Sequence, residues 1–89
     1  MKFEWDESKS QTNLEKHGLS LSGVQPMWEG RVLELESNQP GEPRKLAIGK
    51  IGGKFWPVIF TLRGESVRII SARRSRDNEK KLYHEKDEH

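Results

Sequence analysis

The fold is decided by residues 67–83, VRIISARRSRDNEKKLY, where a strand pattern passes directly into a helix pattern. Three of the first four residues are β-branched, which is typical of a strand. The later part contains no Gly or Pro, and Asp77 and Glu79 would lie in the first helical turn, where the helix dipole favours anions. We therefore expect a strand over residues 66–73 and a helix with Ser75 as its N-cap.

Two arginines, Arg73 and Arg74, lie at the junction of this strand and this helix. Arginine presents a planar fork of donors that suits phosphate, and Glu79 and Tyr83 follow one helical turn apart. A charge cluster is more often a solvated surface, so a basic strand followed by a solvated helix is the competing interpretation. For Glu79 the alternative to substrate contact is a pair with an arginine, and for Tyr83 it is packing on the sheet.

The composition indicates a small polar domain. The chain has 89 residues, which we assign to a single domain over residues 1–89, with 31% hydrophobic and 34% charged residues. Such a chain buries a modest core, so its stability is expected to be marginal. The net charge is only +2, but residues 63–81 hold seven Lys and Arg against three Asp and Glu. This local excess suits a polyanionic partner such as nucleic acid.

The sequence also excludes several classes of protein. It has no cysteine, which excludes disulfides and cysteine-based zinc sites, and its three histidines do not have the spacing of metal ligands. We therefore expect neither a metal nor another cofactor. The start, MKFEWDESK, is charged and unlike a signal peptide, and the longest apolar run is too short to span a bilayer. We expect a soluble cytoplasmic protein without membrane contact.

Two helices are expected in the N-terminal third. Asp6 can cap a first helix that ends near His17, before Gly18. One face of this helix is polar and basic, and it is either a solvated surface or ordered for a ligand. That face carries Lys9, Asn13, Lys16 and His17. A second helix from Ser20 would be short, kinked or irregular, because Pro26 cannot donate a backbone hydrogen bond.

The middle of the chain predicts an antiparallel sheet of about four strands. The expected elements before the final strand are a strand over residues 31–36, a loop over 37–43, and strands over 44–51 and 54–63 joined by Gly52-Gly53. A second turn at Gly64-Glu65, with Gly in the first position of a type II′ turn, leads into the strand over residues 66–73. Residues 1–5 are expected as a short strand or an anchored tail.

Two-residue turns fix which side chains share a face of this sheet. Ser71 would face the core, and Ala72 would share the opposite face with Arg63 and Arg68. Two guanidinium groups placed there repel each other unless an anion lies between them. Pro57 is unusual in a central strand, and a bulge there would shift this register.

The remaining inventory of Arg, Lys, His, Glu and Tyr can cleave RNA by attack of a 2′-hydroxyl on the neighbouring phosphate. That reaction needs a proton acceptor for the hydroxyl, cations for the charge on the phosphoryl oxygens, and a proton donor for the leaving oxygen. Histidine is the side chain that titrates near neutral pH, and tyrosine or tryptophan can orient a nucleotide by stacking. The residue types alone do not separate cleavage of RNA from binding of RNA.

Two stretches at opposite ends of the chain resemble the BrnT toxin family. Residues 3–20, FEWDESKSQTNLEKHGLS, are similar to its aromatic-Trp-Asp start and Lys-His-Gly helix end, and residues 68–83, RIISARRSRDNEKKLY, to its arginine-rich strand and closing helix. The resemblance implies an α+β, RelE-like fold with two N-terminal helices, an antiparallel sheet of about four strands and a C-terminal helix. It also implies a metal-independent ribonuclease toxin that inhibits translation. Its partner would be a BrnA-like antitoxin, and any operator DNA would be bound through that antitoxin.

The resemblance assigns roles to residues in both stretches. His17 would be a general acid or base, supported by Lys16. The candidate catalytic residues are His17, Arg63, Arg68, Arg73 and Tyr83, and the candidate substrate-binding residues are Lys16, Arg74 and Glu79. Arg63 is included for its place beside Arg68 rather than through the family pattern. The competing hypothesis is a non-catalytic nucleic-acid-binding module that uses the same arginines.

Overall fold

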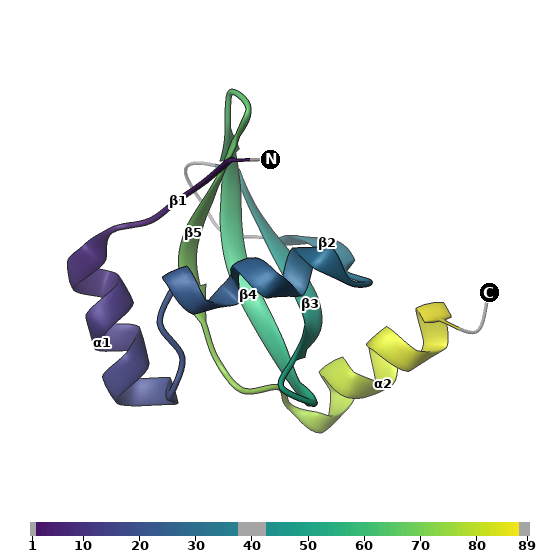
Figure 1. The fold of residues 1–89 in the computed structure, drawn as a ribbon. Coiled ribbons are helices and arrows are strands. Elements are labelled where there is room, and N and C mark those ends of the chain that lie inside the picture. The colour runs from purple at the N-terminus through teal and green to yellow at the C-terminus, as the bar shows by residue number, and fades with distance from the viewer. Residues whose placement is uncertain (1, 38–42, 88–89) are drawn as a thin grey trace.

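The computed structural model describes residues 2–37 and 43–87, so most of the loop predicted over residues 37–43 lies outside the described residues. Within these ranges a five-stranded sheet forms the centre of the molecule, in the order β1-β5-β4-β3-β2 (Figure 1). The elements are β1 (Lys2–Glu4), α1 (Glu7–His17), the 3-10 helix η1 (Ser22–Glu29), β2 (Leu33–Ser37), β3 (Arg44–Ile51), β4 (Lys54–Arg63), β5 (Ser66–Ala72) and α2 (Asp77–Asp87). No described helix has the length and apolar character needed to cross a membrane.

The fold is α+β, but the expected architecture of two N-terminal helices and about four antiparallel strands is wrong. β1 is a fifth strand in the described part of the chain, and it runs parallel to β5 with Phe3 opposite Val67. It is the short strand that was one of the two alternatives for residues 1–5, and three residues are too few for the sequence pattern to decide between them. The second N-terminal helix is the 3-10 helix η1, because Pro26 within it donates no backbone hydrogen bond and Gly23 has a low helix propensity.

The two predicted hairpins and the first helix are confirmed. β3 and β4 pair antiparallel around Gly52 and Gly53, whose φ angles of 58° and 78° are readily adopted by glycine. Gly64 between β4 and β5 has a φ of 60°, as the first position of a type II′ turn requires. α1 is capped by the Asp6 side chain, which accepts the Lys9 N–H, and it ends before a left-handed Gly18.

A bulge in β5 changes which side chains share a face of the sheet. The register between β4 and β5 shifts at Ile59 and Phe60, so Ile70 is the extra residue of β5 opposite this shift. The predicted faces of Ser71 and Ala72 are therefore wrong: Ala72 is 2% exposed in the core, and Ser71 is exposed on the other side. One inserted residue is enough to exchange the two faces, because side chains alternate along a strand.

Before the bulge, the predicted register holds. Arg63 lies opposite Ser66 and Arg68 opposite Thr61, so the two arginines are on the same face of the sheet.

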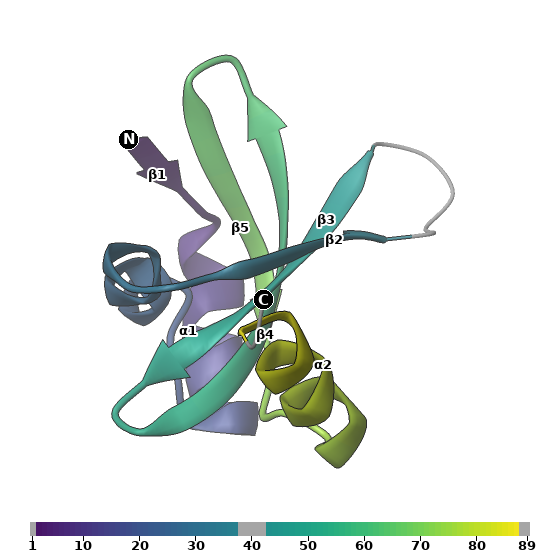
Figure 2. The same ribbon diagram turned by 90° about the vertical axis from the view of Figure 1, so that its right-hand side faces the viewer.

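The main core lies between η1 and one face of the sheet. Figure 2 shows η1 on one side of the sheet and α2 on the other. Val24 and Met27 of η1 are fully buried against β3, β4 and β5, and a Cβ added at Gly49 of β3 would overlap Met27. Trp28 packs edge-to-face on Phe60, with ring centroids 5.5 Å apart. The close approach of η1 to the sheet therefore depends on a glycine in β3.

Candidate functional site

A pocket of about 320 Å³ lies between α1 and β5. β1 pairs with β5 only as far as Arg68, and α1 lies beside the remainder of that strand (Figure 1). The pocket is lined by Ser8, Lys9, Thr12, Asn13, Lys16 and His17 of α1 and by Ile70 and Ser71 of β5. All four residues of the polar, basic face predicted for the first helix are therefore in this pocket, together with two residues around the bulge.

Neutral side chains hold α1 in place. Ser10 is 3% exposed, and its hydroxyl oxygen accepts the N–H of Leu21 at 3.0 Å. The Asn13 amide oxygen accepts the N–H of Ala72 in β5 at 3.2 Å, and its amide nitrogen donates to the carbonyl of Leu19 at 2.7 Å. Leu14, the apolar residue of the helix, is 42% exposed. The basic side chains of α1 are consequently left at the surface.

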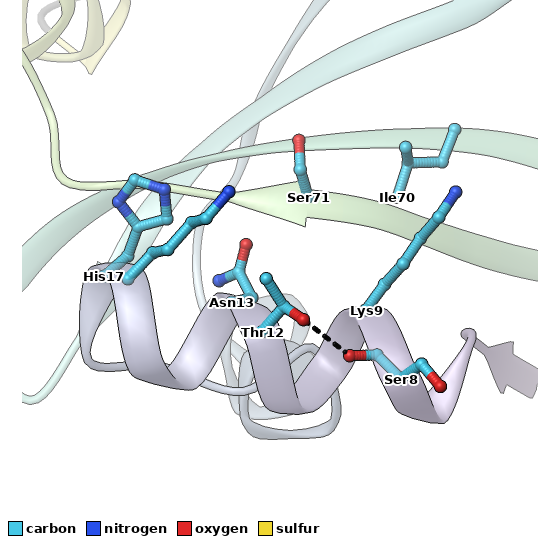
Figure 3. Close-up of a pocket in the computed structure, with 8 residues that line it drawn as sticks. Ser8, Lys9, Thr12, Asn13, His17, Ile70 and Ser71 are labelled. Atoms are coloured by element: carbon cyan, nitrogen blue, oxygen red, sulfur yellow. Dashed lines mark hydrogen bonds between the residues drawn. The ribbon is translucent and has the colours of Figure 1, made fainter.

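The end of α1 places His17 at the pocket. The N–H of Gly18 donates to the carbonyl of Leu14 at 2.9 Å, and Gly18 has a φ of 83°, which ends the helix in the left-handed region. Figure 3 shows the His17 ring and the Lys9 side chain extending from α1 toward β5, where Ser71 lies. His17 is exposed, so substrate and solvent can reach it.

The junction of β5 and α2 is held by an ion pair. Arg73 donates two hydrogen bonds to Glu79, from Nη1 to Oε1 at 2.8 Å and from Nη2 to Oε2 at 2.6 Å. Glu79 Oε1 also accepts the N–H of Arg76 at 2.8 Å, and Arg76 is the residue before the helix. The prediction of Ser75 as N-cap is wrong, because α2 begins at Asp77 and its first backbone bonds, from the N–H groups of Glu79 and Lys80, go to the carbonyl of Arg76.

These contacts set the charge state of the pair. Burial raises the pKa of the Glu79 carboxyl, but the hydrogen bonds from Arg73 and from the Arg76 N–H, with the nearby positive charges, hold it below its ordinary value overall. The hydrogen bond to Glu79 raises the pKa of Arg73. The Glu79 side chain is 8% exposed and that of Arg73 36% exposed. The pairing alternative considered for Glu79 is therefore the arrangement present in the molecule.

Tyr83 packs α2 against the rest of the protein. It is 7% exposed, and its hydroxyl donates to the carbonyl of Arg31 at 3.2 Å. The Arg31 guanidinium lies 4.2 Å above the centre of its ring, and the ring of Phe55 lies 5.0 Å away, edge-to-face. Sequence reasoning did not identify Arg31, because its contact with Tyr83 joins positions 52 residues apart.

The remaining candidate arginines are spread from the β4–β5 turn to the residues after β5 rather than gathered at one point. Arg68 Nη1 lies 3.4 Å from Oε2 of Glu4 in β1, and the guanidinium carbon of Arg74 lies 5.6 Å from the ring centre of Trp56. Arg63 is exposed at the turn end of the sheet, one strand length from Arg73. Seven residues of extended chain correspond to about 23 Å, so these two arginines cannot bind the same phosphate.

The residues around the pocket offer cations, hydroxyls and an amide. In residues 2–37 and 43–87, no three side chains of His, Cys, Asp and Glu come together as a metal site would require. Lys9 is part of the pocket, although the sequence singled it out only as a member of the basic helical face. Its signal was the helical spacing that it shares with Lys16.

The comparison with known families agrees with the two sequence motifs. The family described as the ribonuclease toxin BrnT of type II toxin-antitoxin systems matches residues 5–79, which include most of both stretches. No curated protein matches the chain. Because the match covers well over half of the sequence, the protein belongs to the BrnT family of ribonuclease toxins of type II toxin–antitoxin systems.

Proposed function

We propose that the protein is a metal-independent endoribonuclease that cleaves RNA in the pocket between α1 and β5 and so inhibits translation in the cytoplasm. The observation that carries this location is the meeting of Lys16 and His17 in one surface pocket. Arg73, Glu79 and Tyr83 instead make the contacts that hold α2 to the sheet. Phosphate-binding and proton-transfer groups that are exposed to solvent suit a substrate as large as RNA.

The proposed reaction uses the RNA's own nucleophile. The 2′-oxygen attacks the adjacent phosphorus, the bond from phosphorus to the 5′-oxygen breaks, and the products are a 2′,3′-cyclic phosphate and a 5′-hydroxyl. His17, at the C-terminal end of α1, donates the proton that the leaving 5′-oxygen takes up. The proton of the 2′-hydroxyl passes to solvent water. Lys16 stabilises the charge that develops on the phosphoryl oxygens.

The arginines take different parts in this proposal. Arg68 lies on the same face of the sheet as Ser71, because their partners Thr61 and Ile59 are two residues apart in β4. Arg68 therefore continues the basic surface beyond the pocket and binds a flanking phosphate, as exposed Arg74 does at the other end of β5. Arg73 is a positioning residue that fixes the strand end through Glu79.

Membership of this family implies a protein antitoxin as partner and RNA as target. We propose a BrnA-like antitoxin that covers the pocket with acidic side chains, since Lys9 and Lys16 present positive charge there. Operator DNA would then be bound through the antitoxin. Co-purification should raise the melting temperature by binding linkage, and it should protect α1 from hydrogen exchange. Protection confined to the opposite face of the molecule would contradict this placement.

The decisive experiment incubates the purified protein with structureless RNA in the presence of EDTA. We expect cleavage, and we expect cyclic-phosphate ends on the products. RNA whose 2′-hydroxyls are replaced by methoxy groups should be bound but not cut. Loss of cleavage on adding EDTA, or equal cleavage of the methoxy RNA, would contradict the mechanism, and binding of ordinary RNA without cleavage would favour the non-catalytic binding module.

A further inference from the structure

Lys9 and Lys16 lie at two separate positions along the pocket. They are seven residues apart in α1, which is about 10.5 Å along a helix and nearly two full turns. The Cα–Cβ bonds of a helix all tilt toward its N-terminus, so the two lysine side chains leave α1 in the same direction from separate points. Lys9 and Lys16 are therefore spaced to bind two different anions, and a single phosphate does not account for both.

The Lys9 ammonium group is available for a ligand. The residue is exposed, and its backbone N–H is the group bonded to the Asp6 cap. Across residues 2–37 and 43–87, the Lys9 ammonium takes part in neither an ion pair nor a hydrogen bond. A cation held beside a pocket without a protein carboxylate is suited to an anion from outside the protein.

The pocket wall facing Lys9 and Lys16 has the chemistry of a nucleotide contact. Ile70, the extra residue at the bulge, is half-buried and gives an apolar surface, and Ser71 beside it presents an exposed hydroxyl. The Thr12 hydroxyl between the lysines donates to the carbonyl of Ser8 at 3.0 Å (Figure 3). An apolar patch and a hydroxyl between two cations match a ribose or base between two phosphates.

We propose that Lys9 forms a second phosphate subsite, which binds the backbone phosphate of a nucleotide flanking the cleaved bond. The proposal rests on the function proposed for Lys16 and His17 and extends it by one step along the RNA. Arg68 lies further along the same face and continues the path. The protein then binds an extended single strand along α1, and RNA that reaches past the cleaved bond gains a contact that a dinucleotide lacks.

Binding measurements test the subsite without requiring cleavage. The probe is a hexanucleotide with 2′-methoxy groups, and its affinity is measured against salt concentration for the unchanged protein, Lys9→Gln and Lys81→Gln. Lys81 is an exposed lysine of α2 outside the pocket, so its variant is the matched control for loss of one charge. For Lys9→Gln we expect roughly three- to tenfold weaker binding at low salt and a salt slope smaller by about 0.7, the loss of one phosphate contact on a single strand.

Two further comparisons decide between the subsite and other roles of Lys9. Lys9→Arg, which keeps the charge, should restore the affinity and the salt slope. Lys9→Gln should weaken binding of the hexanucleotide by a larger factor than binding of a 2′-methoxy dinucleotide, which has no flanking phosphate. Equal affinity of Lys9→Gln and the unchanged protein, an equal loss in Lys81→Gln, or an equal loss for the dinucleotide and the hexanucleotide would each overturn the proposal. Absence of any cleavage would refute the proposed activity alone, because the binding result stands by itself.

Discussion

The two α-helices have the same length but are attached to the sheet by different kinds of contact. α1 and α2 each span 11 residues, and both are predominantly polar. α1 is held by an amide and a hydroxyl, from Asn13 and Ser10, that bind backbone groups. α2 is held by the ion pair of Arg73 with Glu79 and by the ring of Tyr83. The basic residues of α1 therefore remain at the surface, while the residues of the α2 motif are used in packing.

The histidines of the two helices show the consequence of this difference. His17 of α1 lines the pocket beside β5. His84 of α2 is exposed as well, but its ring packs edge-to-face on Phe55 at 5.4 Å and on Tyr83 at 5.9 Å. The same residue type is thus a candidate for proton transfer on one helix and a packing residue on the other. What holds an element in place decides which of its side chains are available for chemistry.

The largest expected difference between the two helices is in catalysis. His17→Ala should lower RNA cleavage by about a hundredfold or more, the usual contribution of a general acid, and it should change the pH dependence of the rate. His84→Ala is the matched control, and it should leave the rate within about threefold of the unchanged protein. Thermal unfolding should show that His17→Ala is folded, because His17 is exposed. A comparable loss in both variants would remove the distinction between the helices.

The features of the fold that sequence predicted are those encoded over short distances. Asp6 and Gly18 mark the ends of α1, and glycine pairs or single glycines mark the hairpin turns. For residues 1–5 the sequence left a short strand and an anchored tail open, because three residues carry no periodicity and the partner β5 is more than 60 residues away. The bulge at Ile70 escaped because its signal is a single extra residue in an unbroken run of strand-forming residues.

The same distinction between short-range and long-range signals applies to the candidate site. Lys16 and His17 were placed correctly on one helical face, and the pocket contains both. The sequence could not show that Arg73 would bind Glu79 in bidentate geometry, because this depends on the path of the chain between strand and helix. It also could not show that the bulge turns Ser71 toward the pocket side.

The second prediction concerns the stability of α2. Arg73→Ala leaves the buried carboxylate of Glu79 without its ion-pair partner, and we expect a loss of about 2 kcal/mol in the free energy of unfolding, measured with urea. This is less than the roughly 3–5 kcal/mol of a fully buried pair, because the Arg73 side chain is 36% exposed. The double variant Arg73→Ala with Glu79→Gln should recover part of the stability, since no buried charge remains.

Cleavage by the same variants separates the two roles of Arg73. If Arg73 only fixes the position of the strand end, RNA cleavage should recover together with stability in the double variant. If stability recovers and cleavage stays low, Arg73 contacts the RNA, and the α2 motif is chemical as well as structural.

The third prediction concerns the attachment of α1. Asn13→Ala removes the acceptor of the Ala72 N–H and the donor to the Leu19 carbonyl, and we expect a loss of about 1–2 kcal/mol. Hydrogen exchange should become faster in α1 and at the end of β5, while α2 keeps its protection. Asn78→Ala on α2 is the control, because Asn78 is exposed. Equal loosening of both helices would mean that they are not attached independently.

The smallest expected effect is the response of the two attachments to acid. Glu79 has a pKa below its ordinary value in the folded protein, so its ion pair contributes fully above the carboxyl range of the unfolded chain. As the pH falls below about 4, the unfolded chain takes up a proton at this carboxyl. The contribution of the ion pair then decreases until the pH has fallen through the lowered pKa of the folded protein. Burial works against the pair, which keeps the effect small. The groups that attach α1 are a hydroxyl and an amide, which do not titrate there.

Unfolding free energies measured between about pH 2 and 7 should therefore fall less steeply in acid for Glu79→Gln than for the unchanged protein. Glu15→Gln, at an exposed position of α1, should follow the unchanged protein. Parallel curves for all three would mean that the ion pair of α2 adds no pH-dependent stability, and the contrast with α1 would then rest on geometry alone.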